Sequence, residues 1–185
     1  MAAVVHHLLG LSGSLRSQST NTAVLKTLSK RLGDQAHMSL FALNDIPAYN
    51  ADLEADALPA SVVALKTAIT QAAGLIICSP EYNYGMPGVL KNALDWASRP
   101  GFNSPLKGKP VLIMTSSPGL LGGVRAQSQL RETLTATFSR VINCPQIVIP
   151  VINQKIRKGE FEDEATTAFM VAAVDDLIRE INLLE

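Results

Sequence analysis

Several features that mark particular classes of protein are scarce or missing in this 185-residue sequence. It has only two cysteines, Cys78 and Cys144, and their separation matches no metal-binding spacing. No apolar run approaches the roughly 18 residues that a membrane-spanning helix needs. The start of the chain, Met1 to His7, lacks the basic and apolar segments of a secretory signal. We therefore expect a protein of the reducing cytoplasm, with no metal site and no membrane partner.

An excess of charge of either sign is also missing. Lys and Arg together number 16, as do Asp and Glu, so the formal net charge is zero. Proteins that bind nucleic acids usually show a strongly basic balance. The composition therefore argues against nucleic acid as a partner, although it leaves room for one localised anion site.

What the sequence does contain is a regular alternation of short apolar runs and amphipathic segments. The apolar runs predict five strands, and segments with apolar residues three and four positions apart predict five helices. The strands are expected at Val4 to Leu11, Ala36 to Leu43, Gly74 to Ser79, Val111 to Thr115 and Gln146 to Val151. The helices are expected at Thr20 to Leu32, Pro59 to Ala73, Pro87 to about Arg99, Arg125 to Val141 and Glu164 to Leu184.

This alternation predicts a single α/β domain over residues 1–185. Strands that alternate with helices form a parallel sheet with helices on both faces. We expect a flavodoxin-like three-layer sandwich with five parallel strands in the order 2-1-3-4-5. Ligands of such sheets bind at the carboxyl ends of the strands, near the switch between strands one and three. The loops after strands one, three and four are therefore the ones to examine for a site.

The loop after the first predicted strand, residues 13–21 (GSLRSQSTN), is rich in hydroxyl groups and leads into a helix. Free N–H groups and the positive dipole end at a helix start favour a phosphate. The alternative is that Ser19, Thr20 or Asn21 simply caps the helix. The glycine patterns of nucleoside-triphosphate and dinucleotide sites are absent, and so is a complete Gly-x-Ser-x-Gly of hydrolases. A terminal monophosphate, such as that of FMN, remains.

The loop after the third strand, residues 79–88 (SPEYNYGMPG), brings two tyrosines together at a strand end. The rings of Tyr82 and Tyr84 are suited to pack against a flat heterocycle. Gly85 and Gly88 permit turns with positive φ and a close approach of the backbone. The alternative is an ordinary loop whose tyrosines cover the core.

The loop after the fourth strand, residues 115–123 (TSSPGLLGG), is rich in glycine and hydroxyl groups. Leu120 and Leu121 are expected to be exposed there and to line an acceptor pocket or a subunit contact. Arg125 is suited to attract a cofactor phosphate or to pair with an acid across an interface. The alternative is a plain connection from strand to helix.

Other chemically distinctive residues are interpreted as structural. The histidines lie on predicted strands, and two adjacent ones point to opposite faces of a strand, so they cannot chelate together. Cys78 is expected to be a buried and unreactive thiol. Trp96 is expected to pack in the core or between subunits. Lys91, Asp95 and Arg99 are spaced to stack along one helix.

These motifs resemble the NADPH-dependent FMN reductase family, and within it the bacterial chromate- and quinone-reducing members. The resemblance rests on GSLRxxSxN at 13–21, PEYNYxxPGxLKNALDW at 80–96, GKP at 108–110 and TSSxGxxGG at 115–123. It covers the chain from about Val4 to Val151, with the motifs in the order of the family.

The resemblance implies an enzyme that takes electrons from NADPH or NADH and passes them through bound FMN to a small-molecule acceptor. Quinones, free flavins, chromate and azo compounds are the acceptors it suggests. It also implies a homodimer or homotetramer, and it assigns no side chain as a catalytic acid or base. The FMN-binding residues that it implies are Ser14, Arg16, Ser19, Thr20 and Asn21 for the phosphate, Pro80, Glu81, Tyr82, Asn83 and Tyr84 for the ring, and Ser116, Ser117 and Gly119 from the third loop.

Two other functions are compatible with the same fold. A flavodoxin-type carrier exchanges electrons with protein partners, but such carriers tend to be strongly acidic, and this chain has no net charge. A non-catalytic module that binds a small ligand is the second alternative. Bleaching of a bound flavin by NADPH would exclude it.

Overall fold

Strands made almost entirely of apolar residues lie at the centre of the computed structural model, which describes residues 5–55 and 58–184. β3 (Gly74–Ser79) and β4 (Pro110–Ser116) are buried along their whole length. Strands that are covered on both faces have this continuous apolar pattern. β1 (His6–Ser12) and β2 (Ala36–Phe41) extend the sheet on one side, and β2 is the partly exposed edge.

The strands pair in the predicted order, β2-β1-β3-β4-β5, and every pair in this sheet is parallel. The expectation of one fifth strand from Gln146 to Val151 was wrong in detail, because two short strands share that edge. β5 (Arg140–Val141) pairs with the beginning of β4, and β6 (Ile147–Ile149) pairs with its end.

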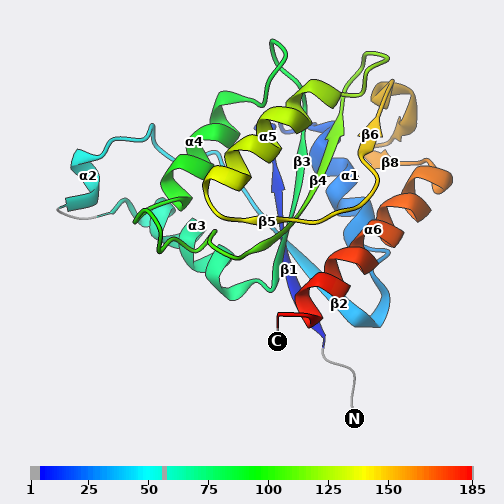
Figure 1. Cartoon of the computed structure of the whole chain (residues 1–185). Coiled ribbons are helices and arrows are strands. Elements are labelled where there is room, and N and C mark those ends of the chain that lie inside the picture. The colour runs from blue at the N-terminus through cyan, green and yellow to red at the C-terminus, as the bar shows by residue number, and fades with distance from the viewer. Residues whose placement is uncertain (1–4, 56–57, 185) are drawn as a thin grey trace.

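Helices cover both faces of the sheet and complete three layers (Figure 1). α1 (Thr20–Ser29) and α6 (Glu164–Asn182) bury their apolar side chains in one core. α3 (Ala60–Gln71), α4 (Gly88–Ala97) and α5 (Val124–Ala136) bury theirs in a second core on the opposite face. None of the helices in the described part of the chain is long and apolar enough to cross a membrane.

α5 is shorter than the sequence predicts. It was expected to continue to Val141 with Phe138 on its inner face, but it ends at Ala136 and Phe138 is half exposed. Phe138 adopts a left-handed φ of 62°, and the next N–H, that of Ser139, donates to Leu134 O. Glycine or asparagine usually occupies this position after a helix, so a phenylalanine here carries no stop signal.

Trp96 is fully buried, which decides between the two places expected for it. Its Nε1–H donates to the carbonyl of Pro47 at 2.8 Å. Asn92 binds the same carbonyl and accepts from the N–H of Tyr49, so α4 holds the long segment that showed no pattern in the sequence. The short helix α2 (Asp52–Ala55) lies in that segment. Trp96 is therefore a core residue and not a subunit contact.

The predicted stacking of charges along α4 is only half present. Lys91 pairs with Asp95 at 2.7 Å, but Arg99 lies beyond the end of the helix. There its guanidinium is near Glu54, at 3.9 Å, and over the ring of Tyr49.

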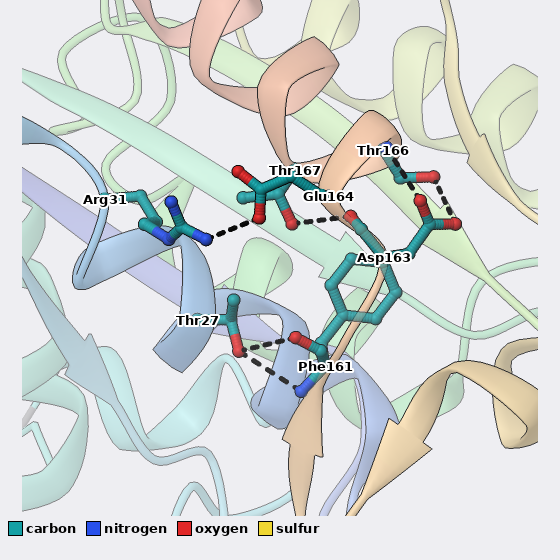
Figure 2. Close-up of polar contacts among 7 residues, drawn as sticks. All are labelled: Thr27, Arg31, Phe161, Asp163, Glu164, Thr166 and Thr167. Atoms are coloured by element: carbon teal, nitrogen blue, oxygen red, sulfur yellow. Dashed lines mark hydrogen bonds and ion pairs between the residues drawn. The ribbon is translucent and has the colours of Figure 1, made fainter.

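A small hairpin that the sequence analysis did not predict precedes α6 in the chain and packs against α1. Its strands are β7 (Ile156–Arg157) and β8 (Glu160–Phe161). Figure 2 shows the Thr27 hydroxyl on α1 between the N–H and the carbonyl of Phe161, at 3.2 and 3.4 Å. The hairpin therefore has a fixed position against α1.

Asp163 joins this hairpin to the start of α6 and should contribute stability that depends on pH. Its carboxylate accepts from the Thr166 N–H at 2.9 Å and pairs with Lys155 at 2.6 Å. The hydrogen bonds from Lys155 and from the Thr166 N–H lower the pKa of Asp163 from 3.8 to about 2. The stabilisation is therefore complete above pH 3.8 and is lost as the pH falls through about 2.

We expect Asp163→Ala to lower the free energy of unfolding by about 1–2 kcal/mol at pH 7, the usual effect of removing a helix cap. The difference from the wild type should shrink between pH 4 and pH 2.5. Asp163→Asn keeps a capping oxygen and should lose less. Urea denaturation at several pH values measures this, and a difference that does not change with pH would contradict the assignment.

Candidate functional site

The loops after β1, β3 and β4 leave the sheet at one edge. In the parallel register Ser12 lies opposite Cys78, and Ser79 lies opposite Thr115. The N–H of Gly13 donates to Cys78 O at 2.9 Å and continues the ladder into the first loop. A Cβ at Gly13 would lie 2.7 Å from the Ser79 hydroxyl oxygen. The first two loops therefore approach each other more closely than any other residue at position 13 would allow.

The first loop ends at a helix start with unused donors. Ser19 caps α1, because its hydroxyl oxygen accepts from the Thr22 N–H at 3.2 Å. The expected alternative of capping is therefore observed, but it uses only one of the free N–H groups. The backbone N–H groups of Thr20 and Asn21 have no acceptor within the described residues. Arg16 is exposed beside them, so this corner is suited to bind an anion.

Asn21 lies beneath the loop and not on its surface. It is 3% exposed, and its Oδ1 accepts from the Ser116 hydroxyl at 2.9 Å and from the Cys78 thiol at 3.3 Å. Burial raises the pKa of Cys78, so the thiol stays protonated and can donate. Asn21 and Ser116 therefore connect α1 to the strands. A contact of Asn21 with the phosphate, and of Ser116 with FMN from the third loop, remain predictions.

The second loop forms a tight turn between Tyr82 and Gly85. The N–H of each residue donates to the carbonyl of the other, at 2.9 and 3.0 Å. Asn83 and Tyr84 between them have φ values of 50° and 67°. The expectation of positive φ at Gly85 and Gly88 was therefore wrong. The expected close approach is present at Gly85, because a Cβ there would lie 2.5 Å from Gln129 Oε1 and would displace that side chain.

This turn is strained and is held in place by α5. A left-handed conformation costs a tyrosine about 1–2 kcal/mol. Gln129 accepts from the Met86 N–H at 2.6 Å, and the guanidinium of Arg125 lies 4.2 Å from the centre of the Tyr84 ring. Residues kept in such conformations cluster at functional sites.

Glu81 connects the second loop to the start of α5. Its carboxylate accepts from the backbone N–H of Arg125 at 2.9 Å and lies 3.8 Å from the Arg125 guanidinium. We call Glu81, Arg125 and Tyr84 the clasp. Arg125 was expected to bind a phosphate or an acid across an interface, and the structure instead pairs it within the same chain. No sequence pattern indicates this pairing, since the two residues are 44 positions apart.

The third loop is fixed at its base and exposed at its tip. The Ser117 N–H donates to Ile149 O, and the Ile152 N–H donates to Ser117 O, both at 3.1 Å. Leu120 and Leu121 are 85% and 53% exposed, as expected, while their place in an acceptor pocket or a subunit contact stays a prediction. A Cβ added at Gly119 would meet only the Ser117 hydroxyl oxygen, at 3.8 Å, among the described residues, so there is space on that side of Gly119.

Together the loops offer two chemically different surfaces at one edge of the sheet. The first loop supplies N–H groups, hydroxyls and Arg16, which suit a phosphate. The second loop supplies the exposed rings of Tyr82 and Tyr84, which suit a flat heterocycle. Pro80 is buried between these two surfaces. Over residues 5–55 and 58–184, no group of three or more His, Cys, Asp or Glu residues is arranged to hold a metal ion. The arrangement is suited to a heterocycle with a phosphate tail.

Comparison with known proteins supports the same interpretation. The model of the NADPH-dependent FMN reductase family matches residues 7–154. A quinone reductase of Escherichia coli is 45% identical over 160 residues, which cover 84% of this chain and 85% of that protein. An NAD(P)H-dependent FMN reductase of Pseudomonas aeruginosa is 43% identical over 141 residues, 76% of each chain.

A solved structure is similar over almost the whole length. It is the flavoenzyme NAD(P)H:(acceptor) oxidoreductase FerB from Paracoccus denitrificans, with a TM-score of 0.86 and 34% sequence identity. The match covers 96% of this chain and 97% of FerB. The chain therefore belongs to the NADPH-dependent FMN reductase family, flavodoxin-like oxidoreductases that use FMN with NAD(P)H as the electron donor.

Proposed function

We propose that this chain, acting as one domain over residues 1–185, is a cytoplasmic FMN-dependent reductase. It takes electrons from NADPH or NADH and passes them to small acceptors such as quinones, free flavins, chromate or azo compounds. The observation that carries the proposal is the meeting of a helix start with free N–H groups and a strained aromatic turn at one sheet edge. The unpaired thiols of Cys78 and Cys144 fit a reducing compartment.

In this proposal the first loop binds the phosphate of FMN. Arg16 is exposed and has no carboxylate partner among the described residues, so its charge is available for a charge-assisted hydrogen bond. The Thr20 N–H and the hydroxyls of Ser14 and Ser19 are close in the chain and add neutral donors. Asn21 and Ser116 support this loop from below through the hydrogen bond that connects them.

The second and third loops border the isoalloxazine ring in this proposal. The backbone N–H groups of Asn83 and Tyr84 have no acceptor in the described residues, and they can stabilise negative charge on the ring. Ser117 and Gly119 lie on the other side, where space is open. Bound FMN supplies the hydride and electron chemistry, and the protein supplies position and access. No side chain needs to act as a general base.

The first test is the visible spectrum of the purified protein. We expect a yellow protein that releases FMN, not FAD, on heating. Under anaerobic conditions NADPH or NADH should bleach it, and a benzoquinone should restore the colour. Release of FAD, or failure of flavin-free protein to take up FMN, would overturn the proposal.

The clasp predicts a specific loss of FMN affinity. Glu81→Ala removes the acceptor of the Arg125 N–H and the charge that faces its guanidinium, so the strained turn loses part of its support. We expect the Kd for FMN to rise about tenfold, as for the loss of a charge-assisted hydrogen bond. Quenching of FMN fluorescence measures it.

Two further variants make this result specific. Glu81→Gln keeps an acceptor oxygen and should weaken binding less. Glu132→Ala removes an exposed carboxylate from the same helix and should leave the Kd unchanged. Wild-type affinity in Glu81→Ala would show that the clasp does not support the FMN site.

The exposed tip of the third loop supports a homodimer or homotetramer. Leu120 and Leu121 are exposed at the same sheet edge as the rings of Tyr82 and Tyr84, and together they offer an apolar surface for a second copy. Trp96 gives no support, since it is buried.

We expect the wild type to sediment as a dimer or tetramer at low micromolar concentration. Leu121→Asp should dissociate it, because a carboxylate would be buried in the contact. Leu183→Asp, at an 80% exposed position at the end of α6, is the matched control and should stay assembled. A wild type that is monomeric and fully active would refute the oligomer.

A further inference from the structure

The corner of the first loop that suits an anion, with Arg16, Ser19 and Thr20, forms one wall of a larger pocket that extends along α1. This open pocket of about 710 Å³ is bounded by the start of α1 on one side and by the tip of the β7–β8 hairpin on the other. Its charged lining residues are Arg16, Lys26 and Lys158, and no carboxylate lines it. The volume is in the usual range for small-ligand sites.

The cations of this pocket differ from those around it. Each neighbouring cation on the hairpin and the end of α1 has a carboxylate partner: Lys30 with Glu160, Arg31 with Glu164, Lys155 with Asp163, and Arg157 with Glu162, at 2.5, 2.5, 2.6 and 3.7 Å. Arg16, Lys26 and Lys158 have no carboxylate within 4 Å in the part of the chain that the structure describes. Their charges are therefore free to attract an anionic ligand.

The two lysines are placed by well-fixed elements. Lys158 and Gly159 form the two-residue tip of the hairpin, which the Thr27 hydroxyl fastens to α1 (Figure 2). Lys26 lies six residues after Thr20, or about 9 Å further along the axis of α1. The lysine end of the pocket is therefore separate from the corner proposed for the FMN phosphate, and it has room for another phosphate.

The same pocket adjoins the third loop. Asn153 lines it, and the preceding residue, Ile152, donates its N–H to Ser117 O. A dinucleotide whose nicotinamide reaches the ring beside Ser117 can therefore extend toward the lysines. Sites for NADH commonly place a carboxylate on the 2′-hydroxyl of the adenosine ribose, whereas sites for NADPH place cations on the 2′-phosphate. This pocket has cations only.

We propose that Lys26 and Lys158 bind the 2′-phosphate of NADPH and make the enzyme prefer NADPH to NADH. The inference rests on the proposed function and names its electron donor. Lys158 lies beyond residues 7–154, the span that the family model matches, so the preference depends on a part of the chain outside the shared motifs.

The test measures binding directly, by calorimetry on the full-length protein with and without FMN. The probes are adenosine 2′,5′-bisphosphate, AMP and inorganic phosphate. We expect adenosine 2′,5′-bisphosphate to bind more tightly than either other probe. Lys26→Ala and Lys158→Ala should each weaken it about tenfold or more, the effect of losing a charge-assisted hydrogen bond. Lys107→Ala, an exposed lysine outside the pocket, is the matched control.

Steady-state kinetics gives the second measurement. In both pocket variants the KM for NADPH should rise about tenfold, while kcat, the KM for NADH and the Kd for FMN stay at wild-type values. Equal effects on NADPH and NADH, or unchanged binding of adenosine 2′,5′-bisphosphate, would overturn the inference. Inorganic phosphate that binds as well as the bisphosphate would show a general anion site and would also overturn it. Failure to bind FMN overturns only the proposed function, because the titration also works without flavin.

Discussion

The burial of β3 and β4 on both faces is the constraint on which the rest of the structure depends. Backbone groups of a strand with no access to water must pair within the sheet. The neighbouring strands are therefore fixed in register, and Ser12, Cys78 and Thr115 reach the same edge. The three loops of the site begin there, close enough that only glycine fits at position 13. The site follows from the register of the sheet before any loop contributes its own chemistry.

The strained turn after β3 depends in turn on the packing of α5. Tyr84 adopts a conformation that is unfavourable for its side chain, and contacts from Gln129 and Arg125 on α5 hold it. The fully buried Leu130 and Leu134 anchor that helix in the core. The apolar packing of α5 on one face of the sheet therefore stabilises the strained turn at the edge of the sheet. Glu81 makes the dependence mutual, since it caps the helix that supports its own loop.

Periodicity predicted the main elements because each buries an apolar face long enough to show a pattern, and β3 has the predicted bounds. It failed where local sequence carries no signal. The strands of the β7–β8 hairpin have two residues each, too few to show an alternating pattern. Phe138 has the left-handed conformation that ends a helix, but glycine, the residue that usually marks this position in a sequence, is absent there. The motifs lie on three loops that the structure brings to one edge of the sheet, as the predicted strand order requires. They could not show the pairing of Glu81 with Arg125, which only the folded chain brings together.

The distribution of charge in the folded protein likewise could not be predicted from composition. A net charge of zero argues against a broad basic surface, but it says nothing of how the charges are distributed. Around the hairpin four cations are neutralised by adjacent carboxylates, so they add no field at longer range. The three cations of the neighbouring pocket keep theirs. A neutral chain can thus concentrate positive potential in one place, provided that acids are paired elsewhere and excluded from that place. The hairpin contributes to both effects. Arg157 and Glu160 on its strands are in ion pairs, whereas Lys158 at its tip has no carboxylate partner among the described residues.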